Sequence, residues 1–277
     1  MSGKLILIGT PIGNLGDISP RALETLEQCD FIAAEDTRVT LKLLNHFGIK
    51  KPMVSYHQHN RNGRGGEICQ RIEAGEVCCL VTDAGMPAIS DPGEDLVALC
   101  AERGVEVGCV PGPTAAATAV ALSGLPSGRF CFEGFLSVAK PGRREHLESL
   151  KDERRTMVFY EAPHKLAATL RDMVKTWGDR RCAIVRELTK IHEEVIRTTL
   201  CAAAERYSEE SPRGEIVLVI EGAAPPEKQT MSLEEAVEQA RALCAEGLSA
   251  SEAAKTAARQ SGLRKGDIYR LLSEDGE

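Results

Sequence analysis

The chain has 277 residues, of which 43% are hydrophobic and 27% are charged, and its formal net charge is −7. This composition is typical of a globular protein of one or two domains, and the negative charge argues against nucleic-acid binding through overall positive charge. No stretch approaches the roughly 20 apolar residues of a membrane span. The first residues, MSGKLILIGTPIGN, predict a strand rather than a signal peptide, so we expect a cytoplasmic protein.

The ten cysteines lie mostly within apolar runs, as Cys79, Cys109, Cys131 and Cys182 do, and no CxxC pair occurs. Cysteines in such positions behave as small buried hydrophobic side chains in a reducing compartment. The sequence therefore predicts neither a zinc site nor a disulfide framework.

In the first half of the chain, short apolar runs alternate with segments of helical spacing. The predicted strands cover residues 4–9, 30–34, 54–56, 77–81 and 104–110. The predicted helices cover residues 21–29, a segment ending at 47, 65–74, 93–102 and 114–123. Strands that alternate with helices imply right-handed crossovers and a mainly parallel sheet.

The strands of this half end in loops rich in glycine, proline and polar residues, most clearly in TDAGMPAISDPG at residues 82–93. Open α/β sheets bind ligands at the carboxyl ends of their strands. After the first strand the glycines follow the spacing Gly9-x-x-x-Gly13-x-x-Gly16, which is neither GxGxxG nor a Walker A sequence. A nicotinamide or nucleoside-triphosphate ligand is therefore disfavoured, and we expect several loops to hold one ligand. The alanine-rich helix after Pro113 fits either close approach of a ligand or tight packing.

Residues 122–129 (LSGLPSGR) predict the boundary between a domain of residues 1–123 and a domain of residues 124–222. The second domain has predicted strands at residues 130–135, 156–160, 182–188, 195–200 and 216–221. These strands are close together with fewer helices between them, which favours a mixed or antiparallel sheet.

Residues 222–231 predict a linker, and a helical module of residues 232–277 follows it. Both Ser232-x-x-Glu235 and Ser249-x-x-Glu252 have the spacing of a capping box. The helix-turn-helix spacing of this module fits a nucleic-acid contact, but its polar residues are of mixed charge, which favours a packing or dimer role.

Eight loops occur in an order that is typical of one family. They are GTPIGN (9–14), AEDTR (34–38), TDAGMPAISDPG (82–93), VPGP (110–113), EGF (133–135), YEAPHK (160–165), ELTK (187–190) and GE (214–215). The chain resembles the small-subunit ribosomal RNA methyltransferase I family of the tetrapyrrole methylase-like (class III) S-adenosylmethionine-dependent enzymes. The resemblance covers residues 4–221, and the helical module resembles the family's C-terminal extension. Lys165 stands where the family pattern has arginine, and Ala162 stands where it has serine.

The resemblance implies an α/β protein of two domains with the tetrapyrrole methylase-like fold, which works as a homodimer without a metal. It implies 2′-O-methylation of a cytidine ribose in the decoding centre of 16S rRNA, with S-adenosylmethionine bound between the two halves. The implied cofactor-binding residues are Pro11, Ile12, Gly13, Asp83, Ala84, Gly85, Met86, Pro87, Ser90, Pro111, Gly112, Pro113, Phe132, Glu133, Gly134, Phe135, Leu188, Thr189, Gly214, Glu215 and Ile216. The Asp83 carboxylate is expected near the sulfonium or ammonium group.

Methyl transfer to a ribose hydroxyl is a direct displacement, so the enzyme aligns the reactants and helps to remove the hydroxyl proton. The candidates for proton removal or oxygen orientation are Glu35, Asp36, His57, Glu161 and Lys190. Among these we favour Glu35 and Lys190 as catalytic residues, although ion pairs or helix caps would explain them equally well.

The predicted RNA contacts are basic or aromatic-ring side chains of the loops, namely Arg38, His57, His59, Arg61, Arg64, Lys140, Arg143, Arg144 and His164. A solvated surface run explains Arg143 and Arg144 as well as a phosphate site does. Two other functions stay open at this point. A tetrapyrrole C-methyltransferase would need a deep apolar trough, against which the polar loops YHQHN and KPGRR argue. A non-catalytic S-adenosylmethionine-responsive RNA-binding regulator would work through the helical module.

Overall fold

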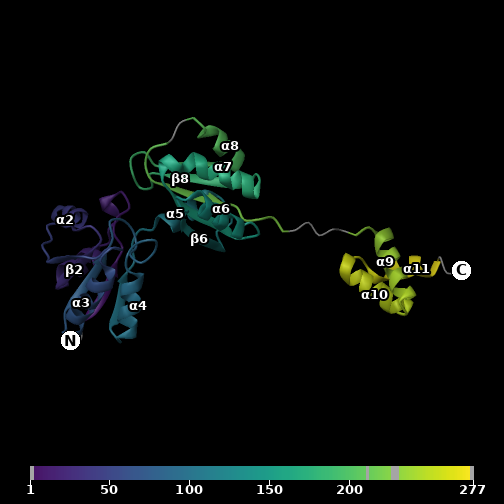
Figure 1. The fold of residues 1–277 in the computed structure, drawn as a ribbon, viewed down its shortest axis with the longest axis horizontal. Coiled ribbons are helices and arrows are strands. Elements are labelled where there is room, and N and C mark those ends of the chain that lie inside the picture. Colours follow the sequence, from purple (N-terminus) through teal and green to yellow (C-terminus); the bar gives the residue numbers. More distant parts are fainter. Residues whose placement is uncertain (1–2, 210–211, 226–230, 275–277) are drawn as a thin grey trace. The chain divides into compact units, whose positions relative to one another are not determined.

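The structure is a computed structural model that describes residues 3–209, 212–225 and 231–274, without the side chains of Arg61 and Asn62. The chain divides into two compact units, residues 1–223 and residues 224–277 (Figure 1). Among the residues described, no helix is both long enough and apolar enough to cross a membrane.

The first sheet of residues 1–223 is parallel throughout and has the strand order β3-β2-β4-β1-β5. Its strands are β1 (Lys4–Ile8), β2 (Phe31–Ala34), β3 (Met53–Ser55), β4 (Val77–Val81) and β5 (Glu106–Val110). This arrangement confirms the predicted parallel sheet. The central strand β4 is buried along almost its whole length, as its continuous apolar sequence predicts.

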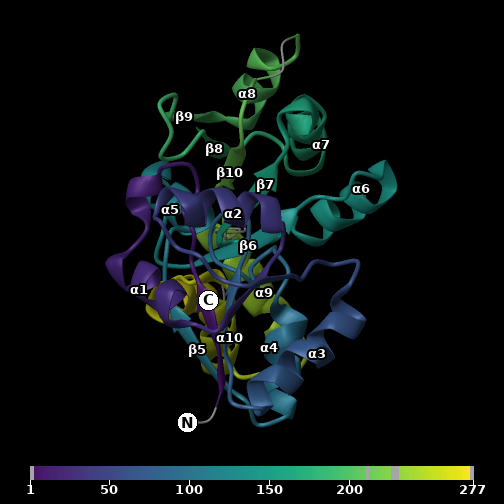
Figure 2. The ribbon, with the colours of Figure 1, turned by 90° about the vertical axis from the view of Figure 1, so that its left-hand side faces the viewer.

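Helices cover both faces of the first sheet. On one face lie α1 (Pro20–Gln28) and α2 (Thr37–His46), and on the other lie α3 (Arg61–Glu73) and α4 (Glu94–Glu102). Figures 1 and 2 show α3 and α4 side by side. The Ser19 hydroxyl accepts a hydrogen bond from the backbone N–H of Ala22 and thereby caps α1 as predicted. Helix α3 begins four residues earlier than predicted. Its first turns contain three glycines, which usually disfavour a helix, so the sequence pattern predicts too late a start.

The second sheet is mixed, as predicted, with the strand order β6-β7-β10-β8-β9. Its strands are β6 (Phe130–Phe135), β7 (Thr156–Glu161), β8 (Arg181–Arg186), β9 (Glu194–Thr199) and β10 (Ile216–Ile220). Strand β6 pairs in parallel with β7, and the other neighbours are antiparallel.

Helices also cover both faces of the second sheet. On one face pack α6 (Lys140–Ser149), α7 (Leu166–Trp177) and α8 (Leu200–Arg206). Helix α8 was not predicted, because its apolar start continues the strand pattern of β9. The other face is covered by α5 (Ala115–Ser123), which follows the last strand of the first sheet but packs on the second.

The cysteines are free thiols in the described residues, and most are buried, Cys79 and Cys182 among them. Cys109 is exposed, contrary to the prediction that it is buried. It lies on β5, an edge strand of which only Val110 is buried. An apolar run therefore does not ensure burial when it forms an edge strand, because helices need not cover both faces of such a strand.

In the second unit, residues 224–277, the described part contains three helices: α9 (Leu233–Ala245), α10 (Ala250–Ser261) and α11 (Lys265–Glu274). The predicted capping box is present at Ser232 and Glu235, and Ser249 caps α10. Helix α10 ends at Gly262, which adopts the left-handed conformation that glycine tolerates best. Small side chains form the core, with Ile268 of α11 fully buried among alanines. The predicted helical module is therefore confirmed.

Candidate active site between the two sheets

Three loops meet at the carboxyl ends of β1, β4 and β5. The backbone N–H of Thr10 donates to the carbonyl of Gly85 over 2.9 Å, and the N–H of Gly85 donates back to the carbonyl of Thr10 over 3.1 Å. The buried Thr10 hydroxyl also donates to the carbonyl of Thr82 over 3.1 Å. These bonds fix the loop after β4 against the loop after β1.

The loop after β5 approaches the loop after β1 so closely that both need glycine. A Cβ atom on Gly112 would lie 2.7 Å from the carbonyl oxygen of Gly9, which is closer than such atoms come in proteins. The N–H of Gly112 instead contacts the Met86 sulfur at 3.3 Å. The close approach explains why a glycine follows each of these two strands.

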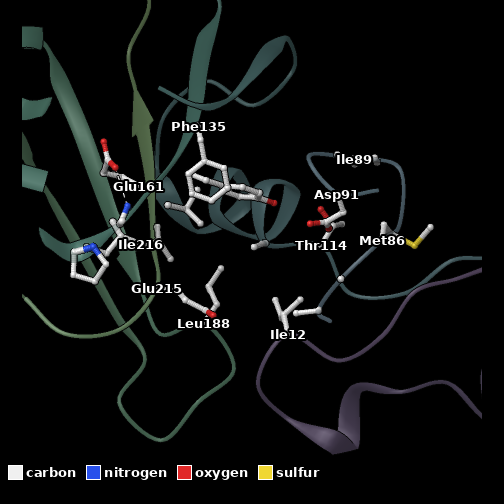
Figure 3. Close-up of a pocket in the computed structure, with 18 residues that line it drawn as sticks. Ile12, Met86, Ile89, Asp91, Thr114, Phe135, Glu161, Leu188, Glu215 and Ile216 are labelled. Carbon is white, nitrogen blue, oxygen red and sulfur yellow. Dashed lines mark hydrogen bonds between the residues drawn. The ribbon is translucent and has the colours of Figure 1, made fainter. Parts of the chain in front are cut away.

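A cavity of about 360 Å³ lies between these three loops and the edge of the second sheet. Its lining consists of Ile12, Ala84, Gly85, Met86, Ile89, Asp91, Thr114, Ala115, Phe135, Tyr160, Glu161, Ala162, Pro163, Val185, Leu188, Glu215, Ile216 and Val217. Figure 3 shows Ile12, Met86 and Asp91 on one side and Phe135 and Ile216 on the other. Most of these side chains are apolar, and a few polar groups lie among them, as is common in small-molecule sites.

Within the described residues, four that are not glycine adopt a positive φ, and all lie in loops beside this cavity. Ala88 (67°) and Ser90 (61°) belong to the loop after β4, and Glu187 (53°) and Thr189 (64°) belong to the loop after β8. Such conformations cost about 1–3 kcal/mol each and concentrate at binding sites. The strained backbone therefore indicates that these two loops belong to a binding site.

Three carboxylates gather on the side of the first sheet. The N–H of Asp83 donates to the Glu35 carboxylate over 3.4 Å, and the Asp83 carboxylate accepts from the N–H of Asp36 over 3.2 Å. Burial, reinforced by neighbouring carboxylates, raises the pKa of both Glu35 and Asp83. Burial, with repulsion from Glu35 and Asp83, raises the pKa of Asp91 to about 6. Asp91 is therefore ionised only in part near that pH.

Asp36 has a different environment from these three carboxylates. Its side chain accepts hydrogen bonds from the guanidinium and the backbone N–H of Arg38, and these bonds hold its pKa well below the usual range. It also caps α2. The Asp36 side chain thus has a structural role, which was the alternative explanation for this candidate.

Lys190 lies at the loop after β8, where its Nζ donates to Glu187 over 2.9 Å and to Glu215 over 3.0 Å. Burial lowers the pKa of Lys190, but hydrogen bonds and attraction from the two carboxylates outweigh it, so the pKa is raised. The aliphatic part of this side chain covers Gly13, where a Cβ would lie 2.6 Å from Cγ of Lys190. Lys190 therefore joins the first loop to the second sheet.

The predicted cofactor residues fall into two groups. Those that line the cavity are Ile12, Ala84, Gly85, Met86, Phe135, Leu188, Glu215 and Ile216. Those outside the lining are Pro11, Gly13, Asp83, Pro87, Ser90, Pro111, Gly112, Pro113, Phe132, Glu133, Gly134, Thr189 and Gly214. Several of the second group shape the loops, as the Gly9–Gly112 approach shows.

The sequence-based prediction missed some of the lining residues. They are Ile89, Asp91, Thr114, Ala115, Tyr160, Ala162, Pro163, Val185 and Val217, whereas Glu161, which also lines the cavity, was among the candidates for proton removal. Most belong to the motifs TDAGMPAISDPG and YEAPHK or to the start of α5, so the motifs were an available signal. Glu161 is buried, and its carboxylate accepts hydrogen bonds from the Ala162 N–H and the Thr169 hydroxyl. No motif marked the strand residues Val185 and Val217.

The predicted RNA-contact residues are not all at the surface. Arg143 is buried, and its guanidinium donates to Asp172 over 2.6 and 2.8 Å, so it is not available to a phosphate. Helical spacing explains this: Arg143 lies on the face of α6 that packs against α7. Its neighbour Arg144 is about half exposed, with a side-chain exposure of 46%.

The other predicted RNA contacts lie in loops or at helix ends. Arg38 is exposed, and Arg64 pairs with Glu67 on α3. The rings of His57 and His59 are 5.9 Å apart, and the Nδ1 of His57 is buried with no partner in the described structure. Lys140 is the first residue of α6, His164 lies in the 3₁₀ turn at Pro163–Lys165, and the side chain of Arg61 lies outside the described residues.

The cavity fits a ligand with an apolar or aromatic portion and a few polar groups. The Phe135 ring lies 5.4 Å from that of Tyr160 and is 57% exposed, so it offers a free face. The Thr189 hydroxyl, next to the lining residue Leu188, is buried and has no partner within the described ranges. A nucleoside that carries a charged substituent has both an aromatic portion and polar groups, so it would fit this cavity. The described residues contain no group of three or more potential ligands that could hold a metal ion.

Comparisons with known proteins agree with this fold. The model of the family Tetrapyrrole (Corrin/Porphyrin) Methylases matches residues 4–204, and that of the RsmI C-terminal HTH domain matches residues 232–275. Ribosomal RNA small subunit methyltransferase I of Synechocystis is 48% identical over 98% of this chain and 98% of its own length. The protein of that name from Thermotoga maritima is 50% identical over 79% of this chain and 99% of its own.

Among solved structures, the uroporphyrin-III C-methyltransferase of Thermus thermophilus complexed with S-adenyl homocysteine has the same fold. The TM-score is 0.55 at 18% identity, and the match covers 78% of this chain and 97% of that one. The fold and its cavity are thus accompanied by close sequence similarity to the ribosomal RNA methyltransferases named above. This chain belongs to the tetrapyrrole (corrin/porphyrin) methylases and, within them, to the ribosomal RNA small subunit methyltransferase I family.

Proposed function

We propose that the protein transfers a methyl group from S-adenosylmethionine to the 2′-hydroxyl of a cytidine in the decoding centre of 16S rRNA. The observation that carries this proposal is the similarity to ribosomal RNA small subunit methyltransferase I along 98% of the chain. The cavity between the sheets supports it, because it offers one enclosed place for a donor next to open loops for a large substrate.

The donor is held by both sides of the cavity. Ala84, Gly85 and Met86, together with Ile12, line one side of it, and Phe135, Leu188 and Ile216 form the apolar wall opposite. S-adenosylmethionine supplies an activated methyl group, so the protein has to align the reactants and remove a proton.

Glu35 and Lys190, the favoured catalytic candidates, do not line the cavity. We assign them positioning roles instead. Glu35 accepts from the N–H of Asp83 and holds the start of the loop after β4. Lys190 bridges Glu187 and Glu215 and holds the wall formed by the second sheet. In both cases the side chain would orient the reactants through a loop.

The RNA is held by the remaining basic side chains around the loops, which are Arg38, His57, His59, Arg64, Lys140, Arg144 and His164. Positive side chains that contact phosphates release counterions, so binding weakens as salt rises. The exposed fraction of Arg38 is 86%, which leaves it free to meet a phosphate despite its pair with Asp36. The helical module adds a further contact to the RNA or to the particle.

The protein acts in the cytoplasm as a homodimer of chains with domains 1–123, 124–222 and 232–277. The homodimer is proposed from the family resemblance, and the exposed apolar side chains of Val138 (74%) and Ile191 (97%) are ones that a second copy would shield from water. Light scattering during gel filtration tests the dimer, and a single peak at the mass of one chain would contradict it.

The central experiment is transfer of labelled methyl from S-adenosylmethionine to small ribosomal subunits that lack the modification. We expect one methyl group per particle, mapped by mass spectrometry to the ribose of one cytidine. Naked 16S rRNA and large subunits serve as controls. Label on a base, or on a tetrapyrrole but no RNA, would overturn the proposal.

A further inference from the structure

A second, smaller cavity lies beside the loop after β4. It measures about 220 Å³, and its lining consists of Gln58, Ala88, Ser90, Asp91, Pro92, Gly93, Glu94 and Asp95. Of the described residues, only Asp91 lines both this cavity and the larger one. The Asp91 carboxylate thus stands where the two cavities meet. Figure 3 shows this side chain at the boundary of the larger cavity, on the side opposite Phe135.

We propose that the second cavity receives the target nucleoside, and that Asp91 accepts the proton of its ribose hydroxyl. This inference rests on the proposed function, and it names the substrate subsite and the base of the reaction. If the donor fills the larger cavity and a nucleoside fills the smaller one, Asp91 is the described lining residue that both would contact. A reacting hydroxyl therefore has to lie within reach of this side chain.

The state of the Asp91 side chain suits this task. It is half-buried, and in the described part of the chain its carboxylate has no hydrogen-bond or ion-pair partner, unlike those of Glu161 and Asp36. Its acceptor positions are therefore free for a substrate hydroxyl. Burial and the nearby Glu35 and Asp83 raise its pKa to about 6, and a base whose pKa lies near the working pH is the most effective. The other titratable groups around it are Tyr160, Glu94 and Asp95, and Glu161 and Glu215 line the opposite side of the larger cavity.

The step balances without another reactant. The O–H bond of the ribose breaks and its proton passes to the Asp91 carboxylate. The oxygen uses its electron pair to form the new bond to the methyl carbon, and the electron pair of the broken carbon–sulfur bond remains on sulfur. Asp91 then returns its proton to water as the product leaves.

The chemistry of the second cavity also favours a particular base. Its polar lining is rich in hydrogen-bond acceptors, with the carboxylates of Asp91, Glu94 and Asp95 and the amide of Gln58. Tyr56 donates to one oxygen of Asp95 over 2.7 Å, which orients that carboxylate. Cytosine presents an exocyclic amine that donates to a carboxylate, whereas uracil presents a carbonyl oxygen at the same position. The cavity therefore selects cytidine over uridine.

The test compares Asp91→Asn with Asp152→Asn, an exposed aspartate that lines neither cavity. Single-turnover methyl transfer to small subunits is measured from pH 5 to pH 9, and the affinity for S-adenosylmethionine is measured by calorimetry. For Asp91→Asn we expect a rate about 10²- to 10⁴-fold lower, as for loss of a general base, with donor affinity within about threefold of the wild type. The wild-type rate should rise through an apparent pKa near 6 and then level off, and this rise should vanish in the variant. Asp152→Asn should behave as the wild type.

Two results would overturn the inference while leaving the proposed function intact. One is an Asp91→Asn rate within threefold of the wild type. The other is a tenfold or larger loss of donor affinity in that variant, which would make Asp91 a donor-binding group. If the wild-type protein methylates no RNA, the proposed function itself fails, so the two failures are distinguishable.

A second measurement tests the subsite independently of Asp91. Small subunits are reconstituted with uridine in place of the cytidine to which the methyl group maps. We expect the wild-type protein to methylate this particle about 10- to 100-fold more slowly, in line with the discrimination that one good base contact provides. Equal rates on the two particles would overturn the assignment of the acceptor-lined cavity to the base.

Discussion

The two sheets of residues 1–223 line the same cavity, but their strands are arranged differently around it. In the first sheet every strand is parallel, so β1, β4 and β5 all end at one edge and extend their loops there. In the second sheet β10 runs antiparallel to its neighbours, so its beginning lies beside their ends. Ile216 pairs with Glu161 on β7 and with Arg186 on β8. A mixed sheet thereby presents strand starts and strand ends together.

The chemistry of the two sides differs as much as their topology. The first sheet contributes long loops that carry the carboxylates of Glu35, Asp83 and Asp91, and their pKa values are raised. The second contributes mainly an apolar wall, which includes Val185 and Val217 of its own strands. We therefore expect changes on the first side to alter the reaction and its pH dependence. Changes on the second side should alter stability and the shape of the donor site.

The largest effect should fall on the second side and concern stability alone. Arg143→Ala removes the two short hydrogen bonds to the buried Asp172 carboxylate and leaves only the 3.9 Å ion pair with Arg144, and breaking a buried ion pair costs about 3–5 kcal/mol. Unfolding in urea measures this loss. The matched control is Arg144→Ala, which removes a half-exposed guanidinium 3.9 Å from the same carboxylate, leaves the two Arg143 hydrogen bonds in place and should cost less than about 1 kcal/mol. Equal stability of the two variants, with weaker RNA binding only in Arg143→Ala, would favour the original RNA assignment instead.

On the first side, the close approach of two loops should couple stability to donor binding. Gly112→Ala places a Cβ within 2.7 Å of the Gly9 carbonyl oxygen, so the loop after β5 must shift. We expect a loss of about 1–3 kcal/mol in the free energy of unfolding, as for overpacking elsewhere. Calorimetry should also show at least tenfold weaker binding of S-adenosylmethionine. Gly128→Ala is the control, because nothing lies within 4 Å of the added Cβ and both properties should be retained.

Much of this comparison could be predicted from the sequence. The apolar run of residues 77–81 indicates a buried parallel strand, and the structure has β4 at those residues. The close spacing of strands after residue 130 indicates a mixed sheet, which is also observed. These features depend on local pattern, which sequence records directly.

The remaining features depend on contacts between distant residues. The partner of Arg143 lies 29 residues away on another helix, and nothing near Arg143 in the sequence indicates it. Helix α5 follows the first sheet in sequence yet packs on the second. Val185 and Val217 line the cavity because of strand register, which the apolar pattern of a fully buried strand leaves undetermined. The motifs thus located the site, whereas the orientation of individual side chains required the fold.

The pH dependence of stability offers a finer test of the first side. The pKa of Asp91 in the folded protein, about 6, is above the ordinary value near 3.9, so ionisation of Asp91 opposes folding. The wild type should therefore lose stability as pH rises between these two values, and Asp91→Asn should not. At pH 8 the variant should be more stable by about 1–2 kcal/mol, allowing for partial solvent screening, and at pH 3 the two should be equal. Urea unfolding at both pH values measures the difference. If the variant is less stable than the wild type at pH 8, ionisation of Asp91 does not oppose folding.

The smallest expected effect distinguishes charge from geometry at Asp83. Its carboxylate accepts the N–H of Asp36 but does not line the cavity, so any attraction to the positive donor acts over a distance. We expect Asp83→Asn, which keeps an acceptor oxygen and removes the charge, to weaken S-adenosylmethionine binding about threefold, a loss of about 0.7 kcal/mol. Asp83→Ala also removes the hydrogen bond that positions the loop and should weaken binding somewhat more. Calorimetry at low and high salt separates the two, because only the charge contribution is screened. If both variants bind the donor as the wild type does, Asp83 has no role in donor binding.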